Sequence, residues 1–233
     1  TQSPLPTPMA YSAVFSHDGN IHVLGGQSTG TEYLDLHYSF DPSANTWFTK
    51  TALPTARRRF AITQFDGLFH CIGGEGAGGE SGTHEVYTPQ TDSWQSRTEL
   101  PTPRKGLGAT TLYNRIYAMG GGVANEEYDP ATDSWREMMA LPQIRTDLTA
   151  LTYGDEIYLL GGTVEEISNQ MYHPDLVNIS GTVSDDFSGV DRVEIGGALA
   201  TITGNTFTAR TLLVKGPQSS SAICWDNAGN SSE

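Results

Sequence analysis

The stretch YDPATDSW, residues 128–135, decides the fold because related stretches recur along this 233-residue chain. FDPSANTW spans residues 40–47, YTPQTDSW spans 87–94, and YHP at 172–174 begins a fourth copy that has no Trp. Two acids between a Tyr and a Trp would suit a sugar-cleaving site or a carbohydrate-binding surface. One active site needs such a pair only once, whereas a feature of every repeat indicates a role in the scaffold.

Substitutions among the copies also favour a structural role. Thr88 replaces the first acid in the second copy, and Asn45 replaces the second acid in the first copy. Asp and Thr side chains bond backbone amides in turns, and Pro ends the pairing of a strand. We therefore predict that each copy is a turn between two strands, and that its large aromatic rings fill the space between neighbouring sheets.

A glycine doublet and a Leu-Pro pair repeat together with these turns. The doublets end the apolar runs IHVLGG, LFHCIGG, IYAMGG and IYLLGG. The Leu-Pro pairs stand at 5–6, 53–54, 100–101 and 141–142, and three of them are followed at the same distance by Arg57, Arg104 and Arg145. The chain therefore contains four units of about 40–50 residues, and the last of them is incomplete.

Each unit carries four strand signals. In the second unit these are FAITQF, LFHCIGG, HEVYT and SWQSR, separated by turn residues such as Asp66-Gly67. Four short strands in a unit of this length match a propeller blade. Residues 1–175 resemble the Kelch-repeat family, through the apolar run with Gly-Gly, the later Tyr or Phe and the spaced Trp. The resemblance implies an all-β fold with about four Kelch-type blades, which form a partial or small propeller.

Residues 176–233 follow a different pattern. Apolar and polar residues alternate in VNISGTV, VDRVEI and TFTAR, with turn residues between them. Together with ITGNTF and WDNAGN, these stretches resemble a bacterial immunoglobulin-like accessory domain. The resemblance implies a small β-sandwich over 176–233, truncated because such modules are longer. We expect the whole chain to be a fragment of a larger protein.

Composition restricts the classes of partner. A net charge of −14 repels phosphate backbones, so we do not expect a nucleic-acid partner. No apolar run approaches the roughly 18 residues of a transmembrane helix. The six histidines show no metal-binding spacing, so neither a metal ion nor a cofactor is expected. The two cysteines, Cys71 and Cys224, are predicted to be buried free thiols.

The candidate binding surface follows from the alternation of turns in an up-and-down sheet. The Leu-Pro-x-x-Arg segments and the loops after each Gly-Gly should open on one face, and the YDPATDSW-type turns should open on the other. Loops on a rigid β-scaffold carry function. The preferred candidates are the non-periodic Arg58, Arg59 and Lys105. The further candidates are Arg57, Arg104, Arg145, Glu75, Glu126 and Glu165. In the alternative interpretation these loops are solvated, and each repeated Arg supports its own blade.

A calcium site is a weaker possibility in the second domain. Asp185, Asp186 and Asp191 supply the oxygen ligands that calcium prefers. Turn formation by Asp explains the same residues without a metal ion.

Three functional hypotheses remain open from the sequence. The first is a non-catalytic binding, adhesion or scaffolding segment of an extracellular or cell-surface prokaryotic protein, which recognises a protein or glycan through the propeller loops. The second is an accessory or partial catalytic region of a carbohydrate-active enzyme similar to a sialidase or galactose oxidase. The third is an intracellular Kelch adaptor. The oligomeric state is not predicted.

Overall fold

The computed structural model describes residues 2–163 with their side chains, and between 170 and 232 it describes only the backbone of β-strands. The chain divides into two compact units, Thr1–Met171 and Tyr172–Glu233. Every helix or strand element of the described part is a β-strand, as the sequence predicts.

The first unit is a series of antiparallel sheets whose strands are neighbours in chain order. The first sheet contains β1 (Ala13–His17), β2 (Asn20–Leu24), β3 (His37–Asp41) and β4 (Thr46–Thr49). The second contains β5 (Ala61–Phe65), β6 (Leu68–Ile72), β9 (His84–Thr88) and β10 (Ser93–Ser96). The third contains β11 (Leu107–Leu112), β12 (Arg115–Gly120), β13 (Asn125–Asp129) and β14 (Ser134–Glu137).

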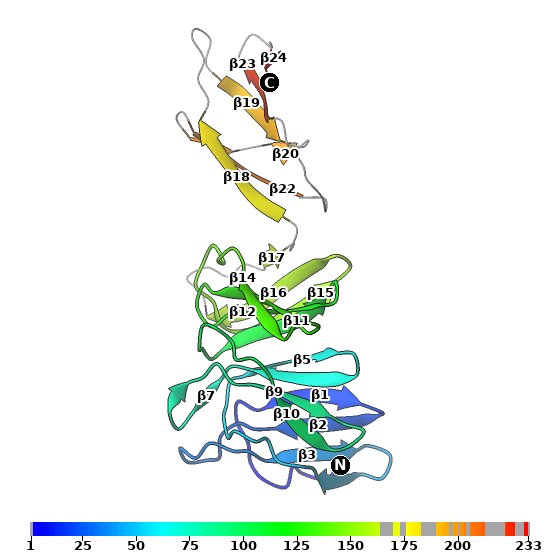
Figure 1. The fold of residues 1–233 in the computed structure, drawn as a ribbon. Helices are drawn as coiled ribbons and strands as arrows, with labels where there is room; N and C mark the ends of the chain where they lie inside the picture. The colour runs from blue at the N-terminus through cyan, green and yellow to red at the C-terminus, as the bar shows by residue number, and fades with distance from the viewer. Residues whose placement is uncertain are drawn as a thin grey trace. The chain divides into compact units, whose positions relative to one another are not determined.

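The fourth sheet has three strands, β15 (Thr146–Tyr153), β16 (Glu156–Thr163) and β17 (Gln170–Tyr172). A short hairpin of β7 (Glu75–Gly76) and β8 (Gly79–Glu80) extends from the second sheet. The sheets follow one another as stacked layers from blue to yellow-green in Figure 1. The first strands of successive sheets contact each other. This is the arrangement of propeller blades that the repeats predict.

The second unit contains two further antiparallel sheets. One contains β18 (Leu176–Thr182), β22 (Thr206–Leu212) and β21 (Thr201–Thr203). The other contains β20 (Ala198–Leu199), β19 (Val190–Ile195), β23 (Ala222–Asp226) and β24 (Ser231–Ser232). The side chains of this unit lie outside the described residues, so the immunoglobulin-like sandwich over 176–233 remains a prediction.

The glycine doublets join neighbouring sheets. The amide of the second glycine donates to an arginine carbonyl of the next sheet, 2.8 Å away in all three cases: Gly26 to Arg57, Gly74 to Arg104 and Gly121 to Arg145. These glycines have positive φ angles. A Cβ atom on Gly74 would lie 2.8 Å from the Arg58 carbonyl oxygen. Both the conformation and the close approach therefore require glycine.

The repeated YDPATDSW turn joins neighbouring sheets at a second place. Asp133 adopts a positive φ of 49° and accepts hydrogen bonds from the Tyr128 hydroxyl at 2.7 Å and the Thr98 amide at 2.9 Å. The Trp135 indole donates to the Thr98 carbonyl at 2.8 Å. Equivalent bonds link Asp92 and Trp94 to Thr51, and Asn45 and Trp47 to Ser3. The predicted turn is confirmed, and its second acid also binds the segment that precedes its own sheet.

This acid stays ionised at neutral pH. Burial raises the pKa of Asp133, but the bonds from Tyr128 and Thr98 outweigh burial and leave that pKa below its usual value. The first acid of the motif acts locally, because Asp129 accepts from the Ala131 amide at 2.9 Å within the turn. Neither carboxylate of YDPATDSW therefore needs a catalytic explanation.

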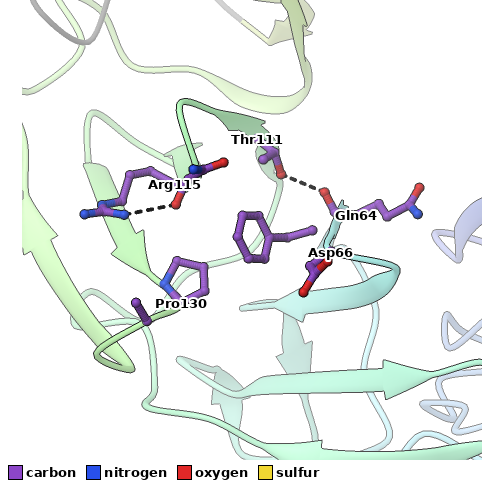
Figure 2. A pocket seen from close by; sticks show the side chains of 8 residues that line it. Gln64, Asp66, Thr111, Arg115 and Pro130 are labelled. Carbon is purple, nitrogen blue, oxygen red and sulfur yellow. Dashed lines mark hydrogen bonds between the residues drawn. The ribbon is translucent and has the colours of Figure 1, made fainter.

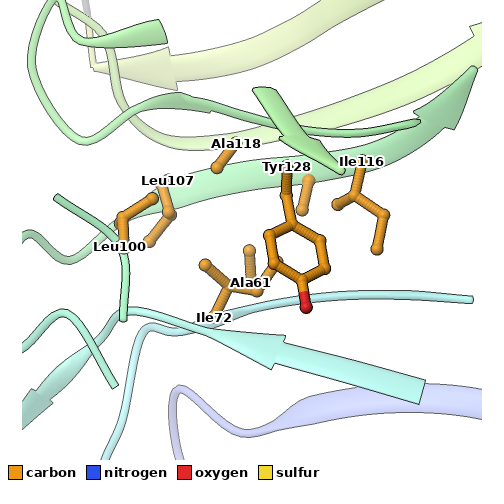
Figure 3. Close-up of a cluster of buried hydrophobic side chains, with 8 residues drawn as sticks. Ala61, Ile72, Leu100, Leu107, Ile116, Ala118 and Tyr128 are labelled. Atoms are coloured by element: carbon orange, nitrogen blue, oxygen red, sulfur yellow. The ribbon is translucent and has the colours of Figure 1, made fainter. Parts of the chain in front are cut away.

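Apolar side chains fill the space between the sheets. Figure 3 shows Ala61 and Ile72 of the second sheet facing Ile116, Ala118 and Tyr128 of the third. Leu100, Leu107 and Ala109 complete this cluster, and Trp135 packs against it. The aromatic positions of the repeat therefore lie between sheets, as predicted.

Cys71 belongs to the neighbouring cluster between the first and second sheets. It is a buried free thiol, as predicted, and burial raises its pKa to about 12. The side chain of Cys224 lies outside the described residues.

Two buried histidine pairs complete this packing. The His37 Nδ1 lies 3.2 Å from the Thr51 carbonyl oxygen, which can only accept a hydrogen bond. A neutral His37 therefore accepts at Nε2 from His22 Nδ1, at 2.9 Å. His70 and His84 repeat the arrangement against the Thr98 carbonyl. Burial lowers the pKa of all four, to about 4 for His22, His37 and His84 and to about 3 for His70.

These pairs predict an acid-sensitive fold. The unfolded chain binds protons on its histidines near pH 6.5, whereas the folded chain does not until about pH 4. The free energy of unfolding should be fully present above pH 6.5 and should fall as the pH drops from 6.5 to 4. The slope should approach about 1.4 kcal/mol per pH unit for each histidine. Urea unfolding at a series of pH values measures it.

His84→Asn is the matched variant, because Asn125 holds the equivalent position in the third sheet and donates to the Met139 carbonyl at 3.1 Å. The variant should keep a donor to Thr98 and show a shallower slope. An unchanged slope would mean that His84 does not contribute to the acid sensitivity.

Candidate functional site

The three periodic arginines lie inside their sheets. Arg104 donates from Nε to the Gly120 carbonyl at 2.6 Å and from Nη2 to the Ala118 carbonyl at 2.9 Å. Its Nη1 donates to the Thr102 carbonyl at 2.9 Å and pairs with the buried carboxylate of Glu126. Arg57 repeats these bonds with Gly73, Cys71, Thr55 and Glu85. Each arginine is therefore bonded to the strand that ends in its own glycine doublet.

This burial decides between the two interpretations of the repeated arginines. Arg57, Arg104, Arg145 and Glu126 are all buried. Arg145 Nη1 donates to the Leu159 carbonyl at 2.9 Å. These four side chains support their blades and offer no surface to a ligand. We therefore exclude them from the candidate surface.

The first sheet shows what can replace the ion pair. Met9 occupies the arginine position, and Tyr38 occupies the position of Glu85. The Thr7 hydroxyl lies 3.0 Å from the Tyr38 hydroxyl, just as the Thr55 hydroxyl donates to Glu85 at 2.7 Å. A neutral pair of similar bulk thus fills the same space.

The comparison predicts the outcome of a double-mutant cycle. Arg57→Met should lower the free energy of unfolding by about 3–5 kcal/mol, because it leaves the Glu85 carboxylate buried without its partner. Combining it with Glu85→Tyr, the first sheet's solution, should recover most of the loss. Urea unfolding of the two single variants and the double variant measures the coupling. A double variant as unstable as the sum of the single variants would contradict the account.

The Leu-Pro-x-x-Arg segments and the loops after the glycine doublets share one face, as the alternation of turns predicts. Arg58 pairs with Glu75, Gly122 pairs with Arg145, and Ala10 pairs with Gln27 through isolated backbone bridges. We call the side chains gathered here the entry cluster. The cluster consists of Tyr11, Gln27, Tyr33, Arg58, Arg59, Glu75, Lys105 and Asp147.

Glu75 is the centre of the entry cluster. Arg58 donates to it from Nε at 2.9 Å and from Nη2 at 2.7 Å. Lys105, from the segment that enters the third sheet, donates at 2.7 Å. These bonds, from Lys105 first and Arg58 second, lower the pKa of Glu75. Arg58 also donates to Gln27 from the loop of the first sheet. Three of the residues predicted from sequence thus form one network.

Two tyrosines that the sequence interpretation missed cover the cations. The Arg59 guanidinium lies 4.4 Å from the centre of the Tyr11 ring. The Arg58 guanidinium lies 5.5 Å from the rings of both Tyr11 and Tyr33. Arg59 forms a long ion pair of 3.6 Å with Asp147. The result is an aromatic and charged surface drawn from all four sheets.

A row of left-handed residues holds this surface. Tyr11, Arg59, Gly106 and Asp147 have φ angles of 58°, 53°, 67° and 57°. Each stands two residues after the buried arginine or its equivalent, Met9. The amide of each donates to the carbonyl of the one before it, at 3.1, 2.8 and 2.7 Å in turn. A left-handed conformation costs a residue with a Cβ roughly 1–2 kcal/mol. Three of the four positions carry this cost, which marks them as functional candidates.

The row predicts an unusual order of stabilities at position 147. Asp147→Gly should unfold with a free energy about 1 kcal/mol higher than Asp147→Ala, because both lose the carboxylate and only glycine relieves the backbone. Thermal and urea unfolding of the two variants measure the difference. Equal stabilities, or a more stable alanine variant, would show that the left-handed backbone is not strained there.

Comparison with known families identifies the repeats. The model of the KLHDC2/KLHL20/DRC7 Kelch-repeats domain matches residues 1–162. The chain belongs to this Kelch-repeat family. No curated protein matches the chain. Kelch repeat domains bind proteins and are generally not catalytic.

An open groove lies at the turns between the second and third Kelch blades (Figure 2). It has a volume of about 800 Å³ and is lined by Gln64, Phe65, Asp66, Thr111, Asn114, Arg115, Pro130 and Ala131. The Thr111 hydroxyl donates to the Gln64 carbonyl at 2.8 Å across the two blades. Arg115 pairs with Asp129 at 3.0 Å. These bonds engage the polar groups of the groove within the protein, so we place the candidate site at the entry cluster instead.

The remaining predicted residues lie beyond the part of the chain described with side chains. Glu165, Asp185 and Asp186 are outside the described residues, and Asp191 lies in β19 without a described side chain. The calcium site therefore remains a prediction. Among the described residues, no group of three or more His, Cys, Asp or Glu could hold a metal ion. No helix there is long and apolar enough to cross a membrane.

Proposed function

We propose that the Kelch blades form a non-catalytic protein-binding module whose recognition surface is the entry cluster. The observation that carries this proposal is the left-handed row. Tyr11, Arg59 and Asp147 keep their side chains where the third blade uses Gly106. Strained backbone that persists at an exposed loop supports a functional role for the side chain.

The chemistry of the cluster suits a protein surface. Tyr and Arg are enriched in protein interfaces, where they supply large contact areas and directed hydrogen bonds. The Nε of Arg59 makes no hydrogen bond among the described residues, and its partner Asp147 is 3.6 Å away. Polar groups of a partner can therefore bind Arg59 without displacing a short ion pair.

We also propose an extracellular or cell-surface location, which is supported by the resemblance of residues 176–233 to bacterial accessory domains. A glycan partner is the finer alternative for the same surface. An intracellular adaptor is the second candidate function, and the match to the KLHDC2/KLHL20/DRC7 family supports it. All these alternatives use the entry cluster and differ in ligand or compartment.

Binding of the full chain to peptide and glycan arrays tests the proposal. A variant with Arg58, Arg59 and Lys105 changed to Ala should lose at least about tenfold in affinity for the bound probes, as expected when central interface residues are removed. Arg136→Ala is the matched control, because Arg136 is an exposed arginine outside the cluster, 2.9 Å from Glu127.

Circular dichroism should show that all variants are folded. Equal binding by wild type and the triple variant would refute the proposed surface. Binding only to glycans would replace the protein partner with a carbohydrate and keep the surface. Turnover of a sugar substrate by the wild-type chain would refute the non-catalytic assignment.

A further inference from the structure

Each Kelch blade has two surfaces that pack against its neighbours. We call the surface that faces the preceding blade the back, and the surface that faces the following blade the front. In the contact between the first two blades, Phe15 on the front of the first stacks on Phe69 on the back of the second, with ring centres 3.8 Å apart. The register of the strands assigns the equivalent residues in every other blade.

The back of the first blade is uncovered. Ile21 is 41% exposed, whereas its equivalents Phe69, Ile116 and Ile157 are 2% exposed or less. Val14 is 56% exposed, whereas its equivalent Ala109 is 8% exposed. The back of the first blade thus presents the same kind of apolar residues that the other blades bury.

The front of the fourth blade is also uncovered. Tyr153 is 76% exposed, whereas its equivalent in the third blade, Leu112, is 6% exposed. Leu151 occupies the position of Phe15 and is exposed as well. Tyr153 lies edge to face with Tyr158 of the neighbouring strand, with ring centres 6.4 Å apart. Large aromatic and aliphatic side chains therefore project from this surface without a neighbouring blade.

The two uncovered surfaces are the two halves of one interface. In the contact between the first and second blades, a front with a large ring packs on a back with aliphatic and aromatic residues. Leu151 and Tyr153 form such a front, and Val14 and Ile21 form such a back. This complementarity indicates a second copy of the same chain as the occupant, because each copy carries both halves.

We propose that two copies of this chain associate front to back. The front of the fourth blade of each copy packs on the back of the first blade of the other. The two contacts are identical, so the pair has twofold symmetry and closes without leaving a free apolar surface. The closed ring has eight blades, which lies within the range of known propellers.

Sedimentation velocity of the full chain over a range of concentrations tests this association. Val14→Asp alters only the back, and Leu151→Asp alters only the front. Both side chains are exposed in the single chain, so both variants should fold, which circular dichroism verifies. Each should raise the dissociation constant of the pair at least about tenfold, because a charge enters the apolar contact. Ile144→Asp is the control, since Ile144 is an exposed apolar residue outside both surfaces.

Mixing the two variants distinguishes this arrangement from other associations. A mixed pair joins the intact front of Val14→Asp to the intact back of Leu151→Asp, so it should form more readily than either variant alone. A wild-type chain that is monomeric at all concentrations would refute the proposal. Variants that associate like the wild type, a mixture that shows no recovery, or assemblies larger than two copies would also refute it.

Discussion

The hydrogen bonds of one buried arginine per blade hold the Kelch unit together. Arg104 accepts a bond at its carbonyl from Gly74 of the preceding blade, and its side chain donates to the Gly120 carbonyl of its own blade. The carboxylate of Glu126 neutralises the guanidinium in this buried space. The residue therefore joins two sheets through its backbone while its side chain fixes the strand that ends in the next doublet. Glycine is required at these doublets because no Cβ fits between the joined segments.

The same arginine positions the surface of the entry cluster. The residues that follow it directly, Arg58 after Arg57 and Lys105 after Arg104, enter the network of Glu75. Two residues after it stands the left-handed row, whose amides and carbonyls bond from blade to blade. Support and recognition thus occupy adjacent positions in one short segment. This proximity explains why a buried periodic cation and an exposed irregular cation occur side by side in the sequence.

The sequence predicted the fold well because the requirements of the blade are local and specific to residue type. Glycine doublets, Trp and the Asp-rich turn each need a particular side chain, and repetition separated them from a catalytic site. The sequence could not decide the role of Arg57, since a supporting and a binding arginine have the same spacing. It missed Tyr11 and Asp147, because a left-handed backbone is visible in a sequence only where glycine marks it, as at Gly106. It also missed the bond from Asp133 to Thr98, which connects residues far apart in the chain.

Hydrogen exchange at the amides of Gly26, Gly74 and Gly121 tests most directly whether these arginine contacts hold the blades together. Each amide is bonded to an arginine carbonyl of the next blade. If these bonds sustain the Kelch unit, the three amides should exchange only when the whole unit unfolds, with equal free energies of opening. Exchange of the three amides at different and lower free energies, while the amides within β6 and β12 stay protected, would contradict that account.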